Sequence, residues 1–431
     1  MELPLGNSNA RWALLLGSVL ISSVVIVQAA RIWLANDLLD SRDLNSIERG
    51  ARLLPVDADA WDRLGRFQQW DFANSDLSAA VLDYQTAVRE EPQSSYYWMD
   101  LASAYEQAGD ITQATEAYQR AEAVYPISAE VAWHYGNFLL RQQEDAEAMK
   151  EIQRAVRTDP SLLPLAISRV WLSSHDVNKL IDQVLPARPD AYFQALDFFE
   201  STRDPDSGLV VWGELLSLGK PFPLSRSFAF LDELIGADRA EDAERVWNQA
   251  FQAAGLAQRP SDSSLINDGG FTQSFPNGGL GWRWEAPLGV SIDFDSPPIP
   301  NGTRSVRLDF GGGSNTDLGA PFQFVPVEPN RTYHFQGYLK TDHITTESGL
   351  RFSIIDPHHP GAVNVVTDNL TGSHPWAVAE ADVSTPAETH FLVVRLYRSP
   401  SRLFENKLGG SVWMAEVSLV PAQKKENFTE Q

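Results

Sequence analysis

Two short stretches of this 431-residue chain combine residue types that could carry out chemistry. Residues 356–361 (DPHHPG) offer two histidines and an aspartate, but adjacent histidines in a Pro/Gly turn seldom converge on one metal ion. Residues 293–298 (DFDSPP) offer paired carboxylates. This stretch follows a strand-like run and is typical of a turn, whereas a glycosidase needs a cleft and an acid of raised pKa. Neither stretch predicts a catalytic site.

The local motifs of common enzymes are absent as well. The sequence contains no glycine-rich phosphate loop, no G-x-S-x-G turn and no H-E-x-x-H helix. It has no cysteine, which excludes disulfides, thiolate metal sites and cysteine nucleophiles. A net charge of −23 would repel a phosphate backbone and argues against nucleic-acid binding. We therefore expect a binding protein and not an enzyme.

The residues best suited to hold a ligand are aromatic and basic side chains in the second half of the chain. Binding a sugar requires a flat aromatic face with polar groups beside it for the hydroxyls. Trp282 and Trp284 alternate, so both would point to one face of a sheet. The alternative is a place in the core, which we expect most for Trp413. The ligand candidates are Trp282, Trp284, Trp376, Arg395 and Arg398.

The part of the chain that must position these residues has the pattern of β-structure. After a polar linker at 256–264, short alternating runs are separated by Gly, Pro, Asn and Asp. The pattern predicts a two-sheet sandwich with jelly-roll connections over residues 265–421, followed by a polar tail at 422–431. The strand-like runs are 305–310, 332–341, 350–356, 390–398 and 412–420.

Six short motifs follow one another in this half: LINDGGFTQS, GWRWEA, GTRSVRLDF, VEPNRTYHFQGYLKTD, GSHPWAVAEADVSTP and KLGGSVWMAEVSLV. Their order resembles the galactose-binding-like sandwiches of carbohydrate-binding module families 4, 9 and 22. The resemblance implies glycan binding and a structural calcium, for which Asn267 and Glu416 would supply oxygen ligands. Thr272 and Ala415 depart from the acidic residues of the family pattern and leave the calcium open. Such sandwiches also serve as structural or protein-binding modules.

The first half of the chain repeats itself every 34 residues. The repeated positions include Pro92, Pro126 and Pro160, and likewise Ala87, Ala121 and Ala155. A fixed period with helical spacing inside it predicts a solenoid of helix pairs. Alanine and glycine would let two helices approach closely, and each proline would end the second helix of its pair.

This pattern resembles the tetratricopeptide repeat (TPR) family, whose W-x-x-L-G-x-x-Y motif is matched best by Trp98-x-x-Leu101-Ala102-x-x-Tyr105. We assign TPR repeats to 38–160 and degenerate TPR-like helical repeats to 161–255. The resemblance implies that a protein partner binds in the groove lined by the first helix of each pair. The alternative for each groove residue is ordinary solvation or packing. The groove residues would be Asp62, Arg66, Tyr96, Met99, Ser103, Trp133, Asn137 and Arg141.

A charge-free run between Arg11 and Arg31 precedes these repeats. Its 19 residues would span about 28 Å as a helix, close to the hydrocarbon thickness of a bilayer. We predict a transmembrane signal anchor at 12–33 after a short cytoplasmic N-terminus at 1–11. The alternatives are a cleaved signal peptide and a buried core helix.

The sequence thus predicts a multidomain α plus β protein: an N-terminal transmembrane helix, a TPR-like α-solenoid and a C-terminal jelly-roll β-sandwich. We expect a membrane-anchored, extracytoplasmic scaffold in a bacterial envelope, on the periplasmic face of the inner membrane or at the cell exterior. Its groove would bind a protein and its sandwich a glycan, in the assembly or export of a surface polysaccharide. The alternatives are a protein scaffold with a structural sandwich, and a glycan-processing enzyme.

Overall fold

The computed structural model describes residues 8–71, 75–256, 264–273, 275–285, 287–296 and 304–422. The described chain is helical up to Ala253 and consists of antiparallel strands and loops from residue 264 on, as the sequence predicts. Most of the linker expected at 256–264 lies outside the described residues, as do the N-terminal residues 1–7 and the tail after 422. The chain divides into two compact units, Met1–Pro186 and Ala187–Gln431.

The first helix, α1 (Ser8–Leu39), carries the apolar run. Among the described residues it is the helix that is long and apolar enough to cross a bilayer by length and composition. The most apolar 18-residue window within its stretch Arg11–Leu39 has a mean hydropathy of 2.2 and is fully exposed, with Leu16 and Leu20 in contact with no core. This exposure argues against the buried-helix alternative, whereas an anchor and a signal sequence both fit it.

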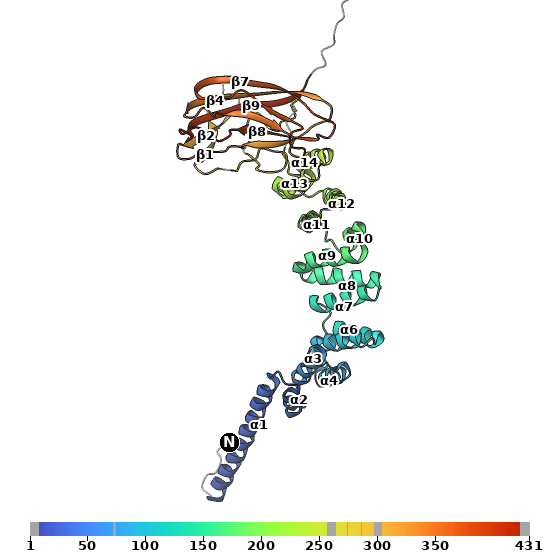
Figure 1. Ribbon diagram of the computed structural model, residues 1–431. Helices are drawn as coiled ribbons and strands as arrows, with labels where there is room; N and C mark the ends of the chain where they lie inside the picture. The colour runs from blue at the N-terminus through green and yellow to red at the C-terminus, as the bar shows by residue number, and fades with distance from the viewer. Residues whose placement is uncertain are drawn as a thin grey trace, which may run out of the picture. The chain divides into compact units, whose positions relative to one another are not determined.

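Helix α2 (Leu44–Leu53) packs against α1, and the eight helices that the structure describes after it in the first unit form consecutive pairs (Figure 1). The second helix of each pair begins at an acidic residue or ends before a proline, as the repeat predicts. Asp76 and Asp110, for example, each accept a hydrogen bond from a backbone N–H in the first turn of the helix that follows. The paired helices are α3 (Ala58–Trp70), α4 (Leu77–Glu90), α5 (Ser95–Gln107), α6 (Ile111–Val124), α7 (Ala129–Arg141), α8 (Asp145–Thr158), α9 (Leu163–Ser174) and α10 (Val177–Gln183).

Small residues at repeated positions bring the paired helices together. Ala80, Ala114 and Ala148 are fully buried, one in each second helix. Gly65 in α3 lies so close to α4 that a Cβ would be 3.0 Å from the ring of Tyr84. Because any larger side chain would hold the two helices apart, these positions set the spacing that the repeat requires.

The second unit begins with two further helix pairs. They are α11 (Pro189–Thr202) with α12 (Pro205–Ser217), and α13 (Phe228–Gly236) with α14 (Ala240–Ala253). Trp212 and Trp247, which keep the rhythm of the second helix in the sequence, are 2% and 3% exposed. The segment 161–255 therefore continues the helical pattern.

Two antiparallel sheets follow, here called the β-domain (residues 264–422). One sheet has five strands in the order β1 (Val290–Ser296), β2 (Ser305–Gly311), β9 (Gly409–Pro421), β4 (Thr332–Ile344) and β7 (Gly372–Ser384). The other has four, in the order β3 (Phe322–Pro326), β8 (Phe391–Tyr397), β5 (Arg351–Ile355) and β6 (Asn364–Val366).

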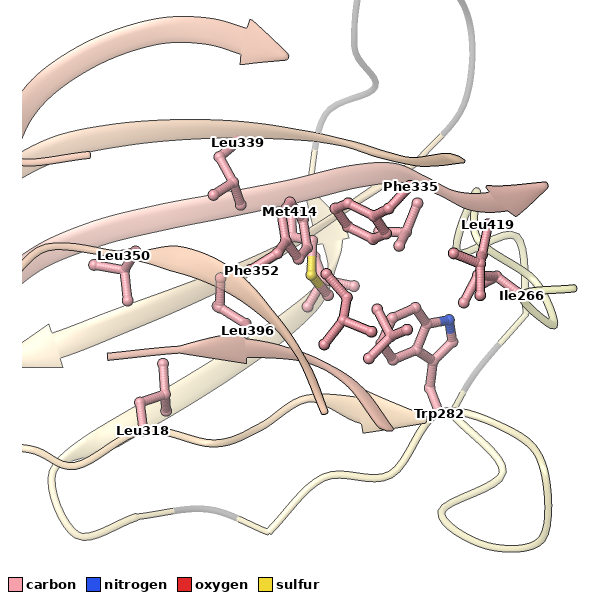
Figure 2. Close-up of a cluster of buried hydrophobic side chains, with 14 of the residues drawn as sticks. Ile266, Trp282, Leu318, Phe335, Leu339, Leu350, Phe352, Leu396, Met414 and Leu419 are labelled. Atoms are coloured by element: carbon pink, nitrogen blue, oxygen red, sulfur yellow. The ribbon is translucent and has the colours of Figure 1, made fainter. Parts of the chain in front are cut away.

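The core of the β-domain lies between these sheets (Figure 2). Burial alternates along β4, so that Phe335 and Leu339 point inward while Gln336 and Lys340 point outward. The inward side chains of both sheets meet around Phe352 and Met414, with Trp282 at one end beside Ile266 and Leu419 (Figure 2).

A glycine-rich loop joins the β-domain to the last helix pair. A Cβ on Gly279 would lie 2.4 Å from the Trp247 ring of α14, and one on Gly278 would lie 2.1 Å from the Phe228 ring of α13. Arg283 forms an ion pair with Asp232 of α13 beside this contact. The bare backbone of the loop thus lies flat on aromatic rings that would otherwise be exposed at the end of the helical repeats.

We expect Gly279→Ala to destabilise the second unit. Gly279 has a φ of +56°, which costs a side chain conformational energy, and the new methyl group would clash with Trp247. The expected loss is about 1–3 kcal/mol, visible as a lower melting temperature of the second unit in calorimetry. Gly313→Ala is the matched control, since nothing lies within 4 Å of its Cβ position. Equal melting temperatures for the two variants would contradict the role of the loop.

Candidate binding surfaces

The helical groove lies on the side of the first helices. In the described part of the first unit, α3 packs against α5 and α5 against α7, closer than the second helices approach one another. A row of helices that approach closely on one side curves toward that side, so α3, α5 and α7 line the concave face. This is the face to which the sequence assigns the predicted groove residues.

Five of the eight predicted groove residues reach solvent. Tyr96 is 38% exposed, and the guanidinium of Arg66 donates a hydrogen bond to its hydroxyl and lies 5.3 Å from its ring centre. Arg141 is exposed, and Ser103 and Trp133 are half-buried. Asp62, Met99 and Asn137 are buried instead, so these three stabilise the groove from within.

The buried Asp62 belongs to a group of two carboxyls and one guanidinium. Its carboxylate lies 2.7 Å from the Arg66 guanidinium, and Arg66 lies 3.9 Å from the carboxylate of Asp100. Burial, together with the nearby negative charge of Asp100, raises the pKa of Asp62 to about 8. Burial also raises the pKa of Asp100. The two acids therefore favour a state in which Asp62 keeps its proton and donates it in a hydrogen bond to Asp100.

A second polar network connects α3 to its neighbours, and sequence reasoning missed it. Gln69 of α3 accepts a hydrogen bond from the Tyr84 hydroxyl at 2.8 Å and donates to Ser103 and Gln107 of α5. Gln69 and Gln107 recur at a spacing of 38 in the sequence, which differs from the 34-residue period, and no local motif marks them.

Arg141 makes a two-pronged contact across the groove. Its guanidinium donates hydrogen bonds of 2.6 and 2.8 Å to the two carboxylate oxygens of Glu106 on α5. The contact links α7 to α5. It also uses part of the hydrogen-bonding capacity of the arginine before a partner binds.

In the β-domain, two of the predicted glycan residues are interior. Trp282 is 1% exposed and packs in the core, with its indole N–H donating to the carbonyl of Asp268 at 3.2 Å (Figure 2). Arg398 is fully buried and donates to the carbonyl oxygens of Ser348 and Thr316. Arg398 therefore holds loops together, and burial argues against ligand contact for both residues.

The other three glycan candidates are half-buried and belong to three different segments of the β-domain. Trp284 packs partly on the core, and its backbone N–H donates to Asn277. Arg395 belongs to β8 of the four-stranded sheet, with its guanidinium 4.9 Å from the ring centre of Tyr397. Trp376 belongs to β7 of the five-stranded sheet.

Trp413, which the sequence analysis assigns to the core, points outward from β9. Its neighbours Val412 and Met414 are fully buried, so Trp413 lies on the opposite face of the five-stranded sheet. Arg307 of β2 and Lys340 of β4 lie directly opposite it in the two flanking strands. The expectation for Trp413 was wrong because strand alternation, and not size or apolarity, decides which face a side chain occupies.

An open hollow of about 380 Å³ lies beside Trp413. It is formed where β4, β7 and β9 run together at one end of the five-stranded sheet. Its lining residues are Lys340, Thr341, Asp342, Ser373, His374, Pro375 and Trp413.

The two sequence stretches whose side chains could carry out chemistry, residues 356–361 and 293–298, form a turn and part of a strand. Asp356 accepts hydrogen bonds from the backbone N–H groups of His358 and His359 and from the Thr389 hydroxyl, so it stabilises a turn. Asp293 lies in β1 opposite Arg307, and Asp295 and the prolines after it lie outside the described side chains.

The predicted calcium ligands lie at the two ends of the β-domain sequence. The side-chain amide of Asn267 donates to the Leu280 carbonyl, and Glu416 sits at a backbone φ of +49°. In the part of the chain that the structure describes, no three His, Cys, Asp or Glu side chains gather where they could hold a metal ion. The calcium stays a prediction.

The comparisons with known proteins agree with the helix pairs. Residues 71–123 and 100–162 match the tetratricopeptide repeat family model, so this part of the chain consists of TPR repeats. No curated protein sequence matches the chain.

Solved structures that resemble parts of the chain do so at low identity. MamA matches at 15% identity, covering 41% of this chain and 86% of its own, with a TM-score of 0.26. Pseudomonas aeruginosa PilF matches at 19%, covering 47% and 78%, with a TM-score of 0.24. A CBM4 structure matches at 13%, covering 36% and 99%, with a TM-score of 0.27. Scores of this size carry no argument about function.

The raised pKa of Asp62 predicts a pH-dependent stability of the groove. Between about pH 4 and pH 8 the folded carboxyl holds a proton that the unfolded chain has released, so the free energy of unfolding falls as the pH rises through this range. Asp62→Asn removes the titration, and we expect it to stabilise α3 to α5 by about 1–3 kcal/mol at pH 8.5 and to change little at pH 4.

Hydrogen–deuterium exchange of peptides from α3 to α5, corrected for intrinsic exchange rates, measures this local effect. Asp59→Asn in the same helix is the control, because Asp59 is half exposed and pairs with Arg63 at the surface. Burial also raises the pKa of Asp83 in α4 to about 7, so the wild type and the variant share its contribution. A pH dependence of equal size in the wild type and in Asp62→Asn would show that Asp62 does not titrate as described.

Proposed function

We propose that the chain is a membrane-anchored, extracytoplasmic scaffold whose TPR groove binds a protein partner and whose β-domain binds a glycan. The observation that carries the proposal is the TPR groove itself, because such repeats present a continuous concave surface suited to protein interaction. Arg66, Tyr96 and Trp133 offer a cation and two aromatic rings there, the side-chain types that dominate protein interfaces.

The anchor is supported by α1. The apolar side chains of its most apolar 18-residue window are exposed, and exposed surface of this kind needs a nonpolar environment. Arg11 precedes the stretch and an acidic segment follows it, which favours a cytoplasmic N-terminus with the repeats outside.

Glycan binding is supported by the outer face of the five-stranded sheet. Trp376 of β7 and Trp413 of β9 lie in the two strands that flank β4. The hollow beside Trp413 offers hydroxyl, imidazole and ammonium groups for a sugar. A setting in the assembly or export of a bacterial surface polysaccharide would use both halves: the groove would recruit a protein component and the β-domain would contact the polymer.

A second candidate function is a protein scaffold in which the β-domain is structural. The glycine loop favours it, because Gly278 and Gly279 cover the Phe228 and Trp247 rings at the end of the helical repeats. A domain that covers the terminal pair of a solenoid acts as a cap and needs no ligand.

Photo-crosslinking tests the partner half. A photoreactive phenylalanine analogue in place of Tyr96 on α5 should give a discrete crosslinked product in cells that normally make this protein. The same analogue at Leu82, which is 63% exposed on α4, is the control on the other side of the helix pair. Arg66→Ala should reduce the crosslinked product from position 96 several-fold, since Arg66 lies beside the ring at this position and lines the same groove. Equal products from both positions would remove the groove as the binding surface.

A glycan array probed with the full chain in detergent tests the second half. We expect binding to at least one class of glycan and a loss of about 5- to 30-fold in Trp376→Ala, because stacking on a tryptophan contributes about 1–2 kcal/mol. Trp70→Ala is the matched control, since Trp70 is 63% exposed but lies in α3. Absence of binding by a chain with an intact melting transition would favour the structural role of the β-domain.

A further inference from the structure

Trp413 is held between positive charges. The ammonium of Lys340 lies 4.6 Å from its ring centre and the guanidinium of Arg307 lies 5.2 Å from it. The two cations reach the ring from β4 and β2, the strands on either side of β9. Cations at this distance are attracted to the π-electrons that a sugar ring would otherwise cover. The ring of Trp413 therefore fixes the two cations in place, and it is less free than Trp376 to stack on a sugar.

The carboxylates near the hollow already have partners. Asp309 pairs with Arg307 at 2.7 Å and accepts a hydrogen bond from Ser411. Asp342 accepts a hydrogen bond from the Ser373 hydroxyl at 2.9 Å and pairs with His343 at 2.7 Å. The Ser373 and His343 contacts lower the pKa of Asp342, so it stays ionised and engaged.

Lys340 forms no ion pair with these carboxylates, although its positive charge helps to lower the pKa of Asp342. Across the described residues, no carboxylate lies within 4.0 Å of its ammonium group, and this group contacts the Trp413 ring. An ammonium carries three N–H donors, and a ring face satisfies none of them as a hydrogen-bond acceptor would. Lys340 also lines the hollow, so these donors are available to a molecule that enters it.

The rest of the hollow suits a charged sugar. Ser373 contributes an exposed hydroxyl group and His374 contributes an exposed imidazole. A volume of about 380 Å³ lies at the small end of the range for ligand pockets, which fits a single sugar unit with its charged group. Trp376 follows His374 and Pro375 along β7, one residue beyond the lining of the hollow.

We propose that this hollow binds an acidic polysaccharide through a carboxylate or sulfate group on the sugar, with Lys340 as the charge partner. The inference rests on the glycan binding proposed above and names the class of glycan. Trp413 positions the ammonium group, and the Ser373 hydroxyl and the His374 imidazole contact the sugar hydroxyls. A neutral polymer of the same shape would leave the donors of Lys340 unmatched and would bind more weakly.

The test compares charged and neutral forms of one backbone. Tetragalacturonate and its methyl ester share one sugar backbone, and the ester replaces the charge of each unit with a methyl group. A sulfated carrageenan tetrasaccharide and its desulfated form provide the second pair. Each is titrated calorimetrically into the full chain in detergent at low salt. The variants are Lys340→Gln and, as control, Lys150→Gln on α8, whose side chain is 75% exposed.

We expect at least one acidic form to bind ten times more tightly than its neutral form. Lys340→Gln should abolish this preference, Lys150→Gln should keep it, and 0.5 M salt should weaken it because exposed charges are screened. The carboxylated and sulfated pairs identify which anionic group is recognised. Equal binding of both members of each pair overturns the inference and leaves glycan binding intact. So does an acidic preference that both variants reduce equally, which indicates non-specific attraction. Absence of binding to every sugar overturns the inference and the proposed glycan function together.

Discussion

The structure depends on the close approach of helices at alanine and glycine positions. Ala80, Ala114 and Ala148 are fully buried, and at Gly65 no side chain larger than hydrogen fits against Tyr84 without a shift. Each pair made in this way has an apolar face on either side, which the next pair must cover. A row of such pairs grows until something else covers its last face. In the second unit that cover is the glycine loop of the β-domain, which lies on Phe228 and Trp247.

This arrangement explains why the loop 277–281 consists mostly of glycine. Aromatic rings at the end of a helix pair present a flat surface, and only a backbone without side chains can lie directly on it. The ion pair between Arg283 and Asp232 and the hydrogen bond from His390 to Asp238 add polar contacts around the apolar one. The β-domain therefore belongs to the same compact unit as α11 to α14.

The charged groups of the groove and of the five-stranded sheet differ in how deeply they are buried. In the groove, Asp62 is fully buried beside Asp100, and desolvation drives the pair to keep a proton although Arg66 lies close. On the five-stranded sheet, Arg307 and Lys340 stay at the surface and are held by the Trp413 ring. A buried charge of this kind mainly affects folding, whereas an exposed cation with unmatched donors is available to a ligand.

The sequence by itself determined the helix-pair repeat, its period and the change to β-structure after residue 264. These follow from local spacing: alanines and prolines 34 residues apart, and alternation in runs such as 332–341. The alternation of residues along β9 also implies that Trp413 points outward, since its apolar neighbours Val412 and Met414 share the core. Only the tertiary structure decided the place of Trp282 and Arg398, because the residues that bury them come from distant segments. It also decided that Arg307, Trp413 and Lys340 form a row, because strand order in a sheet is set by long-range pairing and no local pattern records it.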